Sequence, residues 1–311
     1  MKPEALILAP LPEFLMQPLR QHCLCHDYYH AEDKQALLAE VGTCIRAVVM
    51  YGASQAPEEL LGQLPALEII SVFGVGYDGV PVEYCRQRGL RLTNTPDVLT
   101  DDVADIATAL VLMTSRRLPQ AGRFLHGGEW QKSAFPLTHA LKGKKAGILG
   151  LGRIGKAIAT RLAAHGMKIA YHGRKPQAVD YQYCESAVTL ARESDFLVVA
   201  CPGGPETKHA VNAEVLEALG QDGILINIAR GSVVDESALV EFVQGNRLRG
   251  VGLDVFEHEP SVPEALLKSE RAVLLPHVGS GTVETRQAMA QLCVDNVAAH
   301  LAGLPLLTPV L

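Results

Sequence analysis

Three ionisable residues, Arg230, Glu259 and His277, each follow a short apolar run that predicts a β-strand. Ligands of an open parallel sheet bind outside the carboxyl ends of its strands, so we expect these side chains at one binding edge. A guanidinium stays charged and can bridge two oxygens. A histidine is a general acid near neutral pH, and a carboxylate beside it favours the imidazolium. Together these residues indicate reduction of a carbonyl compound that carries its own negative charge.

A complete GxGxxG sequence at residues 150–155 lies upstream of these residues. The strand-like run 146–149 precedes it, and a predicted helix follows from Lys156. In this context Gly150 permits a tight turn, Gly152 lets the backbone approach a pyrophosphate, and the last glycine lets helix and strand pack closely. The helix N-terminus supplies free N–H groups to the phosphates. The alternative, a purely structural turn, does not account for this strand and helix context.

The end of the next predicted strand, residues 168–172, indicates which dinucleotide is bound. A carboxylate there would favour NAD, because it bonds the ribose hydroxyls and repels a 2′-phosphate. The chain instead continues Gly173, Arg174, Lys175, and no acid follows before Asp180. Arg174 can form bidentate bonds to a phosphate, with Lys175 as a second charge. We expect NADPH, with NADH less favoured; the alternative is a solvent-facing basic turn.

Short apolar runs alternate with helical stretches, which predicts α/β structure with parallel sheets. A long helix is expected over residues 101–117, ended by Pro119, with an irregular stretch over 127–130. The last predicted helix, residues 283–301, has no further units after it, so we expect it to pack on the first domain. The predicted strands are Ala5–Ala9, Ala47–Tyr51, Glu68–Phe73, Arg91–Asn94, Lys145–Gly150, Lys168–His172, Phe196–Ala200, Ile224–Ala229, Gly250–Phe256 and Val273–Leu275.

The composition is that of an ordinary soluble globular protein: 311 residues, 48% hydrophobic, 20% charged, net charge −6. This charge disfavours a nucleic-acid surface, and no apolar run is long enough for a membrane span. Seven scattered cysteines without a CxxC pair fit reduced thiols and a cytoplasmic location. His22, His26 and His30 lie in a stretch that favours a strand, so no metal site is expected.

Four segments together carry a resemblance to a known family: 150–155, 227–231, 252–260 and 276–280. In this order they resemble the D-isomer-specific 2-hydroxyacid dehydrogenases, and the similarity covers nearly the whole chain. Within that family the chain looks most like the glyoxylate/hydroxypyruvate reductases, including the hydroxyphenylpyruvate reductase branch. The run 73–78 supports this similarity.

The resemblance implies two Rossmann-like doubly wound parallel-sheet domains, the coenzyme domain being inserted into a discontinuous substrate domain. The return of the last predicted helix to the first domain sets the expected boundaries. The substrate (catalytic) domain comprises 1–95 and 280–311, and the NADP-binding domain 96–279. The resemblance also implies a homodimer, with Arg230, Glu259 and His277 in the catalytic places.

The resemblance and the strand ends together suggest further site residues. By resemblance, the Val75–Gly76 turn offers N–H groups to the substrate carboxylate, as an anion nest does. By resemblance, Trp130 reaches into the neighbouring subunit's pocket; the alternative is an anchor in the dimer interface. The expected cofactor positions are Gly150, Gly152, Arg153, Ile154, Gly155, Gly173, Arg174, Lys175, Cys201, Pro202, Thr207, Ile228, Ala229, Arg230, Asp254, His277 and Gly279. The expected substrate positions are Val75, Gly76, Arg230, His277, Ser280, Tyr51 and Trp130.

The leading hypothesis is NADPH-dependent reduction of glyoxylate and hydroxypyruvate to glycolate and D-glycerate. A second enzyme hypothesis keeps this chemistry but uses aryl or other 2-keto acids, such as hydroxyphenylpyruvate or the D-lactate type. A third, of a different class, is a dinucleotide-sensing binding protein like the corepressors on the same fold, which fold alone does not exclude. The intact set of arginine, glutamate and histidine favours the enzyme hypotheses.

Overall fold

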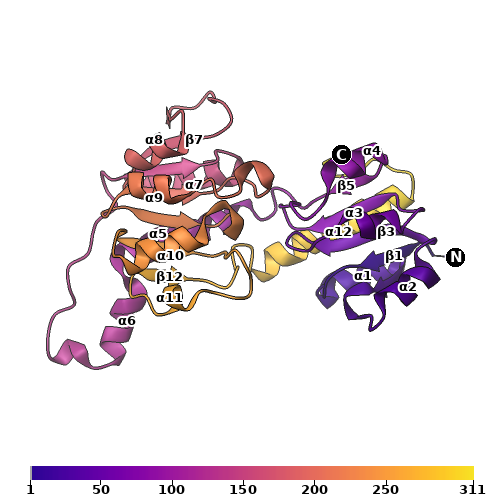
Figure 1. The fold of residues 1–311 in the computed structure, drawn as a ribbon, viewed down its shortest axis with the longest axis horizontal. Helices are drawn as coiled ribbons and strands as arrows, with labels where there is room; N and C mark the ends of the chain where they lie inside the picture. The colour runs from indigo at the N-terminus through magenta and orange to yellow at the C-terminus, as the bar shows by residue number, and fades with distance from the viewer. Residues whose placement is uncertain (1) are drawn as a thin grey trace. The chain divides into compact units, whose positions relative to one another are not determined.

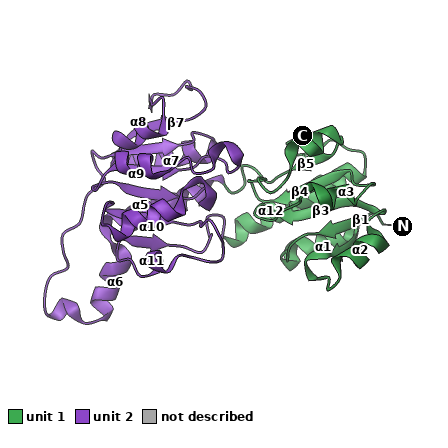
Figure 2. Cartoon of the chain, viewed as in Figure 1, with its two compact units in different colours: residues 1–99, 282–311 green, residues 100–281 purple. Residues whose placement is uncertain are grey.

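The chain folds into two compact α/β units, and the computed structural model describes residues 2–311. Unit 1 comprises Met1–Leu99 and Thr282–Leu311, and unit 2 comprises Thr100–Gly281 (Figure 2). Each unit has its own sheet, in which every paired strand runs parallel to its neighbours. The predicted fold class, two doubly wound parallel sheets in one chain, is confirmed.

Unit 1 is built around a five-stranded sheet in the order β2-β1-β3-β4-β5. Its core is apolar, and the strands β1, β3 and β4 are almost wholly buried, as expected for parallel strands covered on both faces. The long last helix, α12, packs against β4 and α1 (Figure 1). The elements of unit 1 are β1 (Glu4–Ile7), α1 (Glu13–His22), β2 (Leu24–Asp27), η1 (Tyr28–His30), α2 (Lys34–Val41), β3 (Ile45–Tyr51), α3 (Glu58–Gly62), β4 (Ile69–Phe73), α4 (Val82–Gln87), β5 (Arg91–Thr93) and α12 (Val283–Leu301).

Unit 2 is built around a seven-stranded sheet in the order β12-β11-β10-β9-β6-β7-β8. The strand order reverses between β6 and β9, and such a switch point is where open α/β sheets bind ligands. The elements of unit 2 are α5 (Thr100–Arg116), α6 (Leu118–His126), η2 (Glu129–Gln131), β6 (Lys145–Leu149), α7 (Arg153–Ala164), β7 (Lys168–His172), β8 (Gln182–Tyr183), α8 (Ala187–Arg192), β9 (Phe196–Val199), η3 (Pro205–Thr207), α9 (Ala213–Leu219), β10 (Ile224–Asn227), η4 (Gly231–Val233), α10 (Glu236–Gln244), β11 (Gly250–Leu253), α11 (Glu264–Leu267) and β12 (Ala272–Leu274).

Helices cover both faces of the unit 2 sheet. On one face α5 lies against β11 so closely that a methyl group at Gly252 would lie 2.9 Å from the Thr114 hydroxyl. Successive strand residues point to opposite faces, so Val251 and Leu253 point away from α5. Both belong to an apolar cluster with residues of α8, α9 and α10. Because helices cover both faces of this sheet, a ligand can reach it only at the ends of the strands. The reactive side chains are therefore expected at those ends.

The helix α6 was not predicted from the sequence. Pro119 follows the end of α5, as expected, but it also occupies the first turn of α6, where a missing N–H costs nothing. Arg117 links the two helices in a left-handed conformation with φ 49°. The short strand β8 was also missed, because two residues carry too little periodicity to be recognised.

The aromatic and histidine-rich stretch near residue 26 was interpreted as strand. This is confirmed for β2, but it is wrong for the tyrosines that follow, which lie in the 3-10 helix η1. His22, His26 and His30 fall in three different elements, α1, β2 and η1. Nε2 of His26 pairs with the Glu4 carboxylate at 2.7 Å. Among residues 2–311, no helix combines the length and apolar character needed to cross a membrane.

Candidate active site

Arg230, Glu259 and His277 lie at one edge of the unit 2 sheet. β10 leads towards Arg230, β11 towards the loop that carries Glu259, and β12 towards His277. These strands are adjacent and parallel, so their carboxyl ends meet at the same edge. The fold therefore gathers a permanent cation, an acid and a histidine that are up to 47 positions apart in the chain (277 − 230).

The side chains of Glu259 and His277 form a hydrogen-bonded ion pair, with 2.7 Å between Oε2 and Nδ1. The other carboxylate oxygen accepts the backbone N–H of Phe256 at 3.1 Å. Burial raises the pKa of Glu259, but the hydrogen bond and charge of His277, with help from Arg230, outweigh burial and leave this pKa lowered. The carboxylate thus stays ionised beside the imidazole. The two side chains are only 30% and 38% exposed, which strengthens their attraction.

Arg230 is placed by the side chain of Asn227 at the end of β10. The Asn227 amide donates to the carbonyl of Arg230 at 2.9 Å, and its Oδ1 accepts the N–H of Ala229 at 3.0 Å. Nη1 of Arg230 donates to the carbonyl of Ala229 at 2.8 Å. These bonds shape the turn after β10, and the resulting position lets the guanidinium charge act on Glu259.

His277 has a left-handed backbone, with φ 53°, which is strained for a residue with a side chain. The buried carboxylate of Asp254 holds this backbone. Its two oxygens accept the N–H groups of Val278 at 2.7 Å and Gly279 at 2.8 Å. Burial raises the pKa of Asp254, and the two amide bonds oppose that rise without cancelling it. Asp254, which the sequence analysis expects at a cofactor position, is thus bonded to the backbone next to His277.

Gly231 allows the loops after β10 and β11 to touch. A methyl group at this position would overlap the carbonyl group of Phe256 and the amide of Glu257. The Phe256 amide is the group that fixes the Glu259 carboxylate. Because Gly231 has no side chain, the loops that carry Arg230 and Glu259 can lie against each other.

The glycine turn at residues 150–155 connects β6 to α7 beside the switch point of the sheet. Gly150 has φ 99°, and a methyl group there would lie 2.6 Å from Cα of Cys201. A methyl group at Gly155 would overlap the carbonyl of Gly150. In contrast, a methyl group at Gly152 would meet no protein atom within 4 Å. Protein packing explains the first and last glycines, and the open space at Gly152 fits the approach of a phosphate. Arg153 and Ile154 form the first turn of α7.

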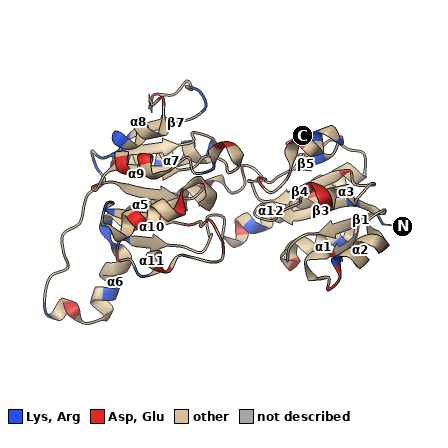
Figure 3. Ribbon diagram, in the orientation of Figure 1, with Lys and Arg blue, Asp and Glu red and all other residues tan. Residues whose placement is uncertain are grey.

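The turn after β7 is basic and exposed (Figure 3). Arg174 and Lys175 are exposed, and within the described part of the chain neither takes part in an ion pair. Gly173 is held by a hydrogen bond from the Tyr183 hydroxyl to its carbonyl at 3.3 Å. The turn is thus fixed at its base and carries two exposed cationic side chains, an arrangement that suits a phosphate.

The loop after β9 lies against the glycine turn, because the backbone of Cys201 contacts Gly150. Burial raises the pKa of the Cys201 thiol to about 11, so this side chain is a neutral packing group. The Thr207 hydroxyl donates to the Pro202 carbonyl at 2.7 Å and thereby braces the loop. Beyond β10, Ile228 and Ala229 are buried, and they continue the same edge towards Arg230.

The carboxyl edge of the unit 1 sheet carries the predicted anion nest. The Asn94 amide donates to the carbonyl of Val75 at 2.8 Å, and Gly74 has φ 155°. Among residues 2–311, the N–H groups of Val75 and Gly76 have no hydrogen-bond acceptor, as an anion nest requires. Tyr51 lies at the same edge, with its ring centroid 5.2 Å from that of Phe73.

Two predicted substrate residues have contrasting surroundings in unit 2. Trp130 lies in η2, beyond α6, and is 68% exposed. Ser280 is half-buried and follows Gly279, whose N–H binds Asp254. Ser280 thus lies next to the backbone that Asp254 binds. Trp130 lies in the segment around α6 and η2, which projects from the rest of unit 2 (Figure 1).

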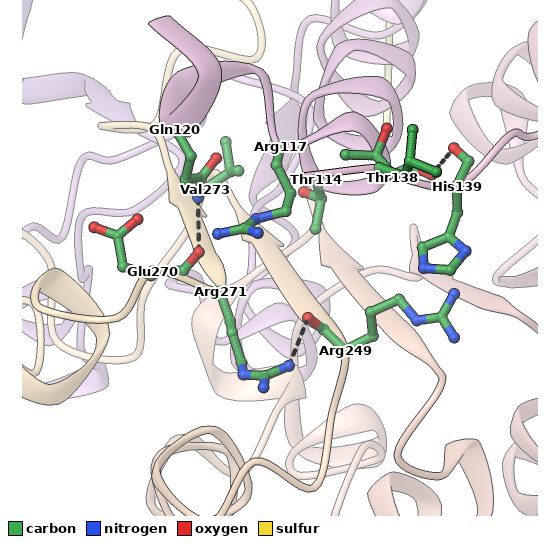
Figure 4. Close-up of a pocket in the computed structure, with 11 residues that line it drawn as sticks. Thr114, Arg117, Gln120, Thr138, His139, Arg249, Glu270, Arg271 and Val273 are labelled. Carbon is green, nitrogen blue, oxygen red and sulfur yellow. Dashed lines mark hydrogen bonds between the residues drawn. The ribbon is translucent and has the colours of Figure 1, made fainter. Parts of the chain in front are cut away.

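A cavity of about 300 Å³ lies at the opposite edge of the unit 2 sheet (Figure 4). Its lining includes Arg249 and Arg271, which immediately precede β11 and β12, together with Arg117 and Leu137 near α6. It lies at the amino ends of the strands whose carboxyl ends carry Asp254 and His277. The cavity is therefore separate from the candidate active site.

Sequence reasoning missed several residues that shape the site. Asn227 and Gly231 were recognised only as parts of a motif, although a polar residue inside a buried strand is a usable signal. Nothing in the sequence near Asn94 indicated its role, because its hydrogen-bond partner, the Val75 carbonyl, is 19 positions away. Within the described chain, no group of three or more His, Cys, Asp or Glu side chains could hold a metal ion.

Comparison with known proteins gives concordant matches. The family model for the D-isomer specific 2-hydroxyacid dehydrogenase NAD binding domain matches residues 108–279. The chain is 49% identical to hydroxyphenylpyruvate reductase from Plectranthus scutellarioides, over 98% of each chain. It is 48% identical to glyoxylate/hydroxypyruvate reductase A from Arabidopsis thaliana, also over 98% of each.

A similar solved structure is that of NADPH-dependent glyoxylate/hydroxypyruvate reductase from Sinorhizobium meliloti, in complex with NADP and malonate. It is 44% identical to this chain, with a TM-score of 0.92, and the match covers 100% of this chain and 97% of the other.

Replacing Gly231 by alanine should destabilise unit 2 and separate the two loops that carry Arg230 and Glu259. We expect a loss of about 1–3 kcal/mol in the free energy of unfolding, because the added methyl group overlaps backbone rather than a flexible side chain. Denaturant unfolding measures this loss. Gly122→Ala is the control, since a methyl group there meets nothing within 4 Å and α6 should tolerate it. Equal stability of the two variants would contradict the close approach described here.

Proposed function

The chain belongs to the D-isomer specific 2-hydroxyacid dehydrogenase family, and we propose that it reduces glyoxylate and hydroxypyruvate with NADPH, giving glycolate and D-glycerate. The observation that carries this proposal is the Glu259–His277 ion pair beside Arg230. It stands at the carboxyl edge of the same sheet that carries the glycine turn. Two similar proteins that are glyoxylate/hydroxypyruvate reductases match this chain over 98% and 100% of its length.

The glycine turn and the basic turn after β7 fit NADPH. The open space at Gly152 and the N-terminus of α7 suit the pyrophosphate, which helix N–H groups bind readily. Arg174 and Lys175 suit a 2′-phosphate, and the turn offers no acid to repel it. The similar reductase from Sinorhizobium meliloti is NADPH-dependent and was solved with NADP. When bound, the dinucleotide supplies the hydride that reaches the carbonyl carbon.

The side chains of unit 2 divide the remaining work of the reduction. Arg230 binds the carboxylate and the carbonyl oxygen, and it stabilises the negative charge that grows on that oxygen. His277 donates the proton that turns the alkoxide into the alcohol, using Nε2, because Nδ1 is bonded to Glu259. Glu259 orients the imidazole through its hydrogen bond with Nδ1, and Asp254 holds the backbone that carries the His277 side chain.

Residues of both units supply the other contacts of the substrate in this proposal. The N–H groups of Val75 and Gly76 in unit 1 bind the substrate carboxylate. Tyr51 of unit 1 and Ser280 of unit 2 contact the substrate near its reacting end. The support is the geometry of the turn, whose free N–H groups form a small anion nest.

A second substrate class, the aryl 2-keto acids, is favoured by one observation. The half-buried ring of Tyr51 stands on the buried ring of Phe73 at the unit 1 edge, where an aromatic substrate could pack on Tyr51. The relative from Plectranthus scutellarioides is a hydroxyphenylpyruvate reductase. A substrate panel distinguishes the two classes.

We propose that the protein is a homodimer whose interface includes the arm, defined as residues 118–137. Four large apolar side chains on the arm are exposed, and Leu137 is 99% exposed. The others are Leu118, Leu125 and Trp130. The arm projects from the body of unit 2 (Figure 1), and Leu137 also lines the cavity at the base of the arm. Such a patch is typical of a surface that another chain covers. Trp130 would then lie at the interface or in the neighbouring subunit's substrate site.

We propose a cytoplasmic location, supported by the state of the cysteines. All seven are free thiols. Burial raises the pKa of Cys85 to about 11 and that of Cys293 to about 12, so both remain protonated and unreactive. Such thiols fit a reducing compartment.

Steady-state rates with both cofactors and four acids test the proposal: glyoxylate, hydroxypyruvate, hydroxyphenylpyruvate and pyruvate. We expect the highest kcat/KM for glyoxylate or hydroxypyruvate with NADPH. Arg174→Ala should lower kcat/KM for NADPH about 10- to 100-fold and leave NADH nearly unchanged, since one charged hydrogen-bond partner of the phosphate is lost. Arg192→Ala, an exposed arginine at the end of α8, is the control. Equal use of both cofactors by the parent protein would refute the cofactor assignment.

The variant Glu259→Gln tests how the ion pair sets the pH dependence. The pKa of the Glu259 carboxyl is lowered, so the carboxylate takes up a proton, and the ion pair is lost, only when the pH falls below the usual carboxyl range. Glutamine has no carboxyl to titrate and cannot form a charged hydrogen bond to His277. We therefore expect a lower rate of reduction at every pH and loss of the low-pH limb that Glu259 sets. Glu257→Gln, whose carboxylate pairs with His209 at 3.1 Å, is the matched control and should keep the parent profile. An unchanged profile in Glu259→Gln would show that the pair has no such role.

A further inference from the structure

A cationic and aromatic cluster stands at the carboxyl edge of the unit 1 sheet, and none of the functions assigned above uses its arginine. Tyr51 ends β3 and Phe73 ends β4, with their ring centroids 5.2 Å apart at an angle of 57°. The guanidinium carbon of Arg286, from the first turns of α12, lies 5.7 Å from the centroid of the Phe73 ring. Three elements distant in sequence therefore bring one cation and one phenol to the same place.

The environment of this cluster makes it a polar recognition surface with an apolar base. Phe73 is 1% exposed, so it serves as the base. Burial raises the pKa of the Tyr51 phenol, and the nearby charge of Arg286 reduces that rise without cancelling it. The phenol therefore stays neutral and can donate a hydrogen bond. Arg286 and Tyr51 are both half-buried, so each can reach a small ligand.

The cluster directly adjoins the anion nest. Phe73 is followed at once by Gly74, and the nest N–H groups belong to Val75 and Gly76. The Gly74 carbonyl accepts the N–H of Thr95 at 2.9 Å, which fixes the turn next to the ring. A 2-keto acid whose carboxylate binds in the nest would therefore place its other carbon atoms near the residues that adjoin the nest.

The two proposed substrates differ in the part of the molecule that would meet this cluster. Glyoxylate ends at its carbonyl carbon, whereas hydroxypyruvate continues with a CH₂OH group. A guanidinium offers hydrogen-bond donors to that hydroxyl, and the Tyr51 phenol can donate or accept. A methyl group in the same place would accept no hydrogen bond from these donors, and a site built to bind a hydroxyl discriminates strongly against an analogue that lacks it.

Resting on the proposed function, we propose that Arg286, with Tyr51, recognises the C3 hydroxyl of hydroxypyruvate and so determines substrate specificity. Arg286 takes no part in the proton transfer. It acts only on acids that have a polar substituent beyond the carbonyl carbon. Glyoxylate, which lacks that substituent, is therefore an internal control within the same enzyme.

The test compares the variant Arg286→Met with the parent, measuring kcat/KM for glyoxylate, hydroxypyruvate and pyruvate with saturating NADPH. Methionine keeps the length and packing of the side chain but removes its charge and donors. We expect hydroxypyruvate to lose about 10- to 100-fold, as for a lost hydrogen bond to a charged donor. Glyoxylate should change by less than about threefold, and pyruvate should gain relative to hydroxypyruvate. Arg286→Lys, which keeps a charged donor, should restore part of the loss.

Arg86→Met is the matched control, because this arginine on α4 is exposed and pairs with Glu83, one turn earlier in the same helix. It should leave all three values at the parent level, and thermal melting should show that each variant is folded. Equal losses for glyoxylate and hydroxypyruvate would overturn the assignment, since Arg286 would then act on the shared carboxylate or on the fold. Unchanged hydroxypyruvate turnover would overturn it as well. A parent protein that reduces neither acid would overturn the proposed function itself, and the assignment with it.

Discussion

The catalytic edge of unit 2 depends on one buried carboxylate, that of Asp254. Its oxygens accept two consecutive backbone N–H groups, those of Val278 and Gly279. Hydrogen bonds to a charged acceptor contribute about 1.5–3 kcal/mol each. This interaction offsets the left-handed backbone of His277, a strain of about 1–3 kcal/mol. With the backbone fixed in this way, the imidazole meets Glu259 at 2.7 Å.

The rest of the site follows from how closely parallel strands and their loops approach. Three adjacent strands deliver Arg230, Glu259 and His277 to one edge, and Gly231 lets two of their loops touch. The glycine turn is at the switch point of the same sheet, so a bound dinucleotide and the acid–base pair share one edge. The buried strands thus position these residues, and their half-exposed side chains remain accessible to a substrate.

Much of this could be predicted from the sequence, because the relevant signals are local. The alternation of apolar runs and helices predicted the parallel sheets, and strand ends predicted where Arg230 and His277 would lie. What the sequence could not reveal is set by long-range contacts. The left-handed backbone of His277 depends on Asp254, 23 positions earlier (277 − 254). Arg286 meets Phe73 only because α12 packs on the sheet of unit 1. Helix α6 was missed because Pro119 signals the end of one helix and the start of another equally well.

The most direct test of this account is the rate of a single turnover of hydroxypyruvate in Asp254→Asn, saturated with NADPH. Asparagine keeps the shape of the side chain but has one acceptor for two N–H groups, and its own NH₂ group would face one of them. If the carboxylate positions His277, the variant should stay folded and its rate should fall about 100-fold, as expected for a small displacement of a catalytic group. A folded variant that turns over at the parent rate would contradict the account.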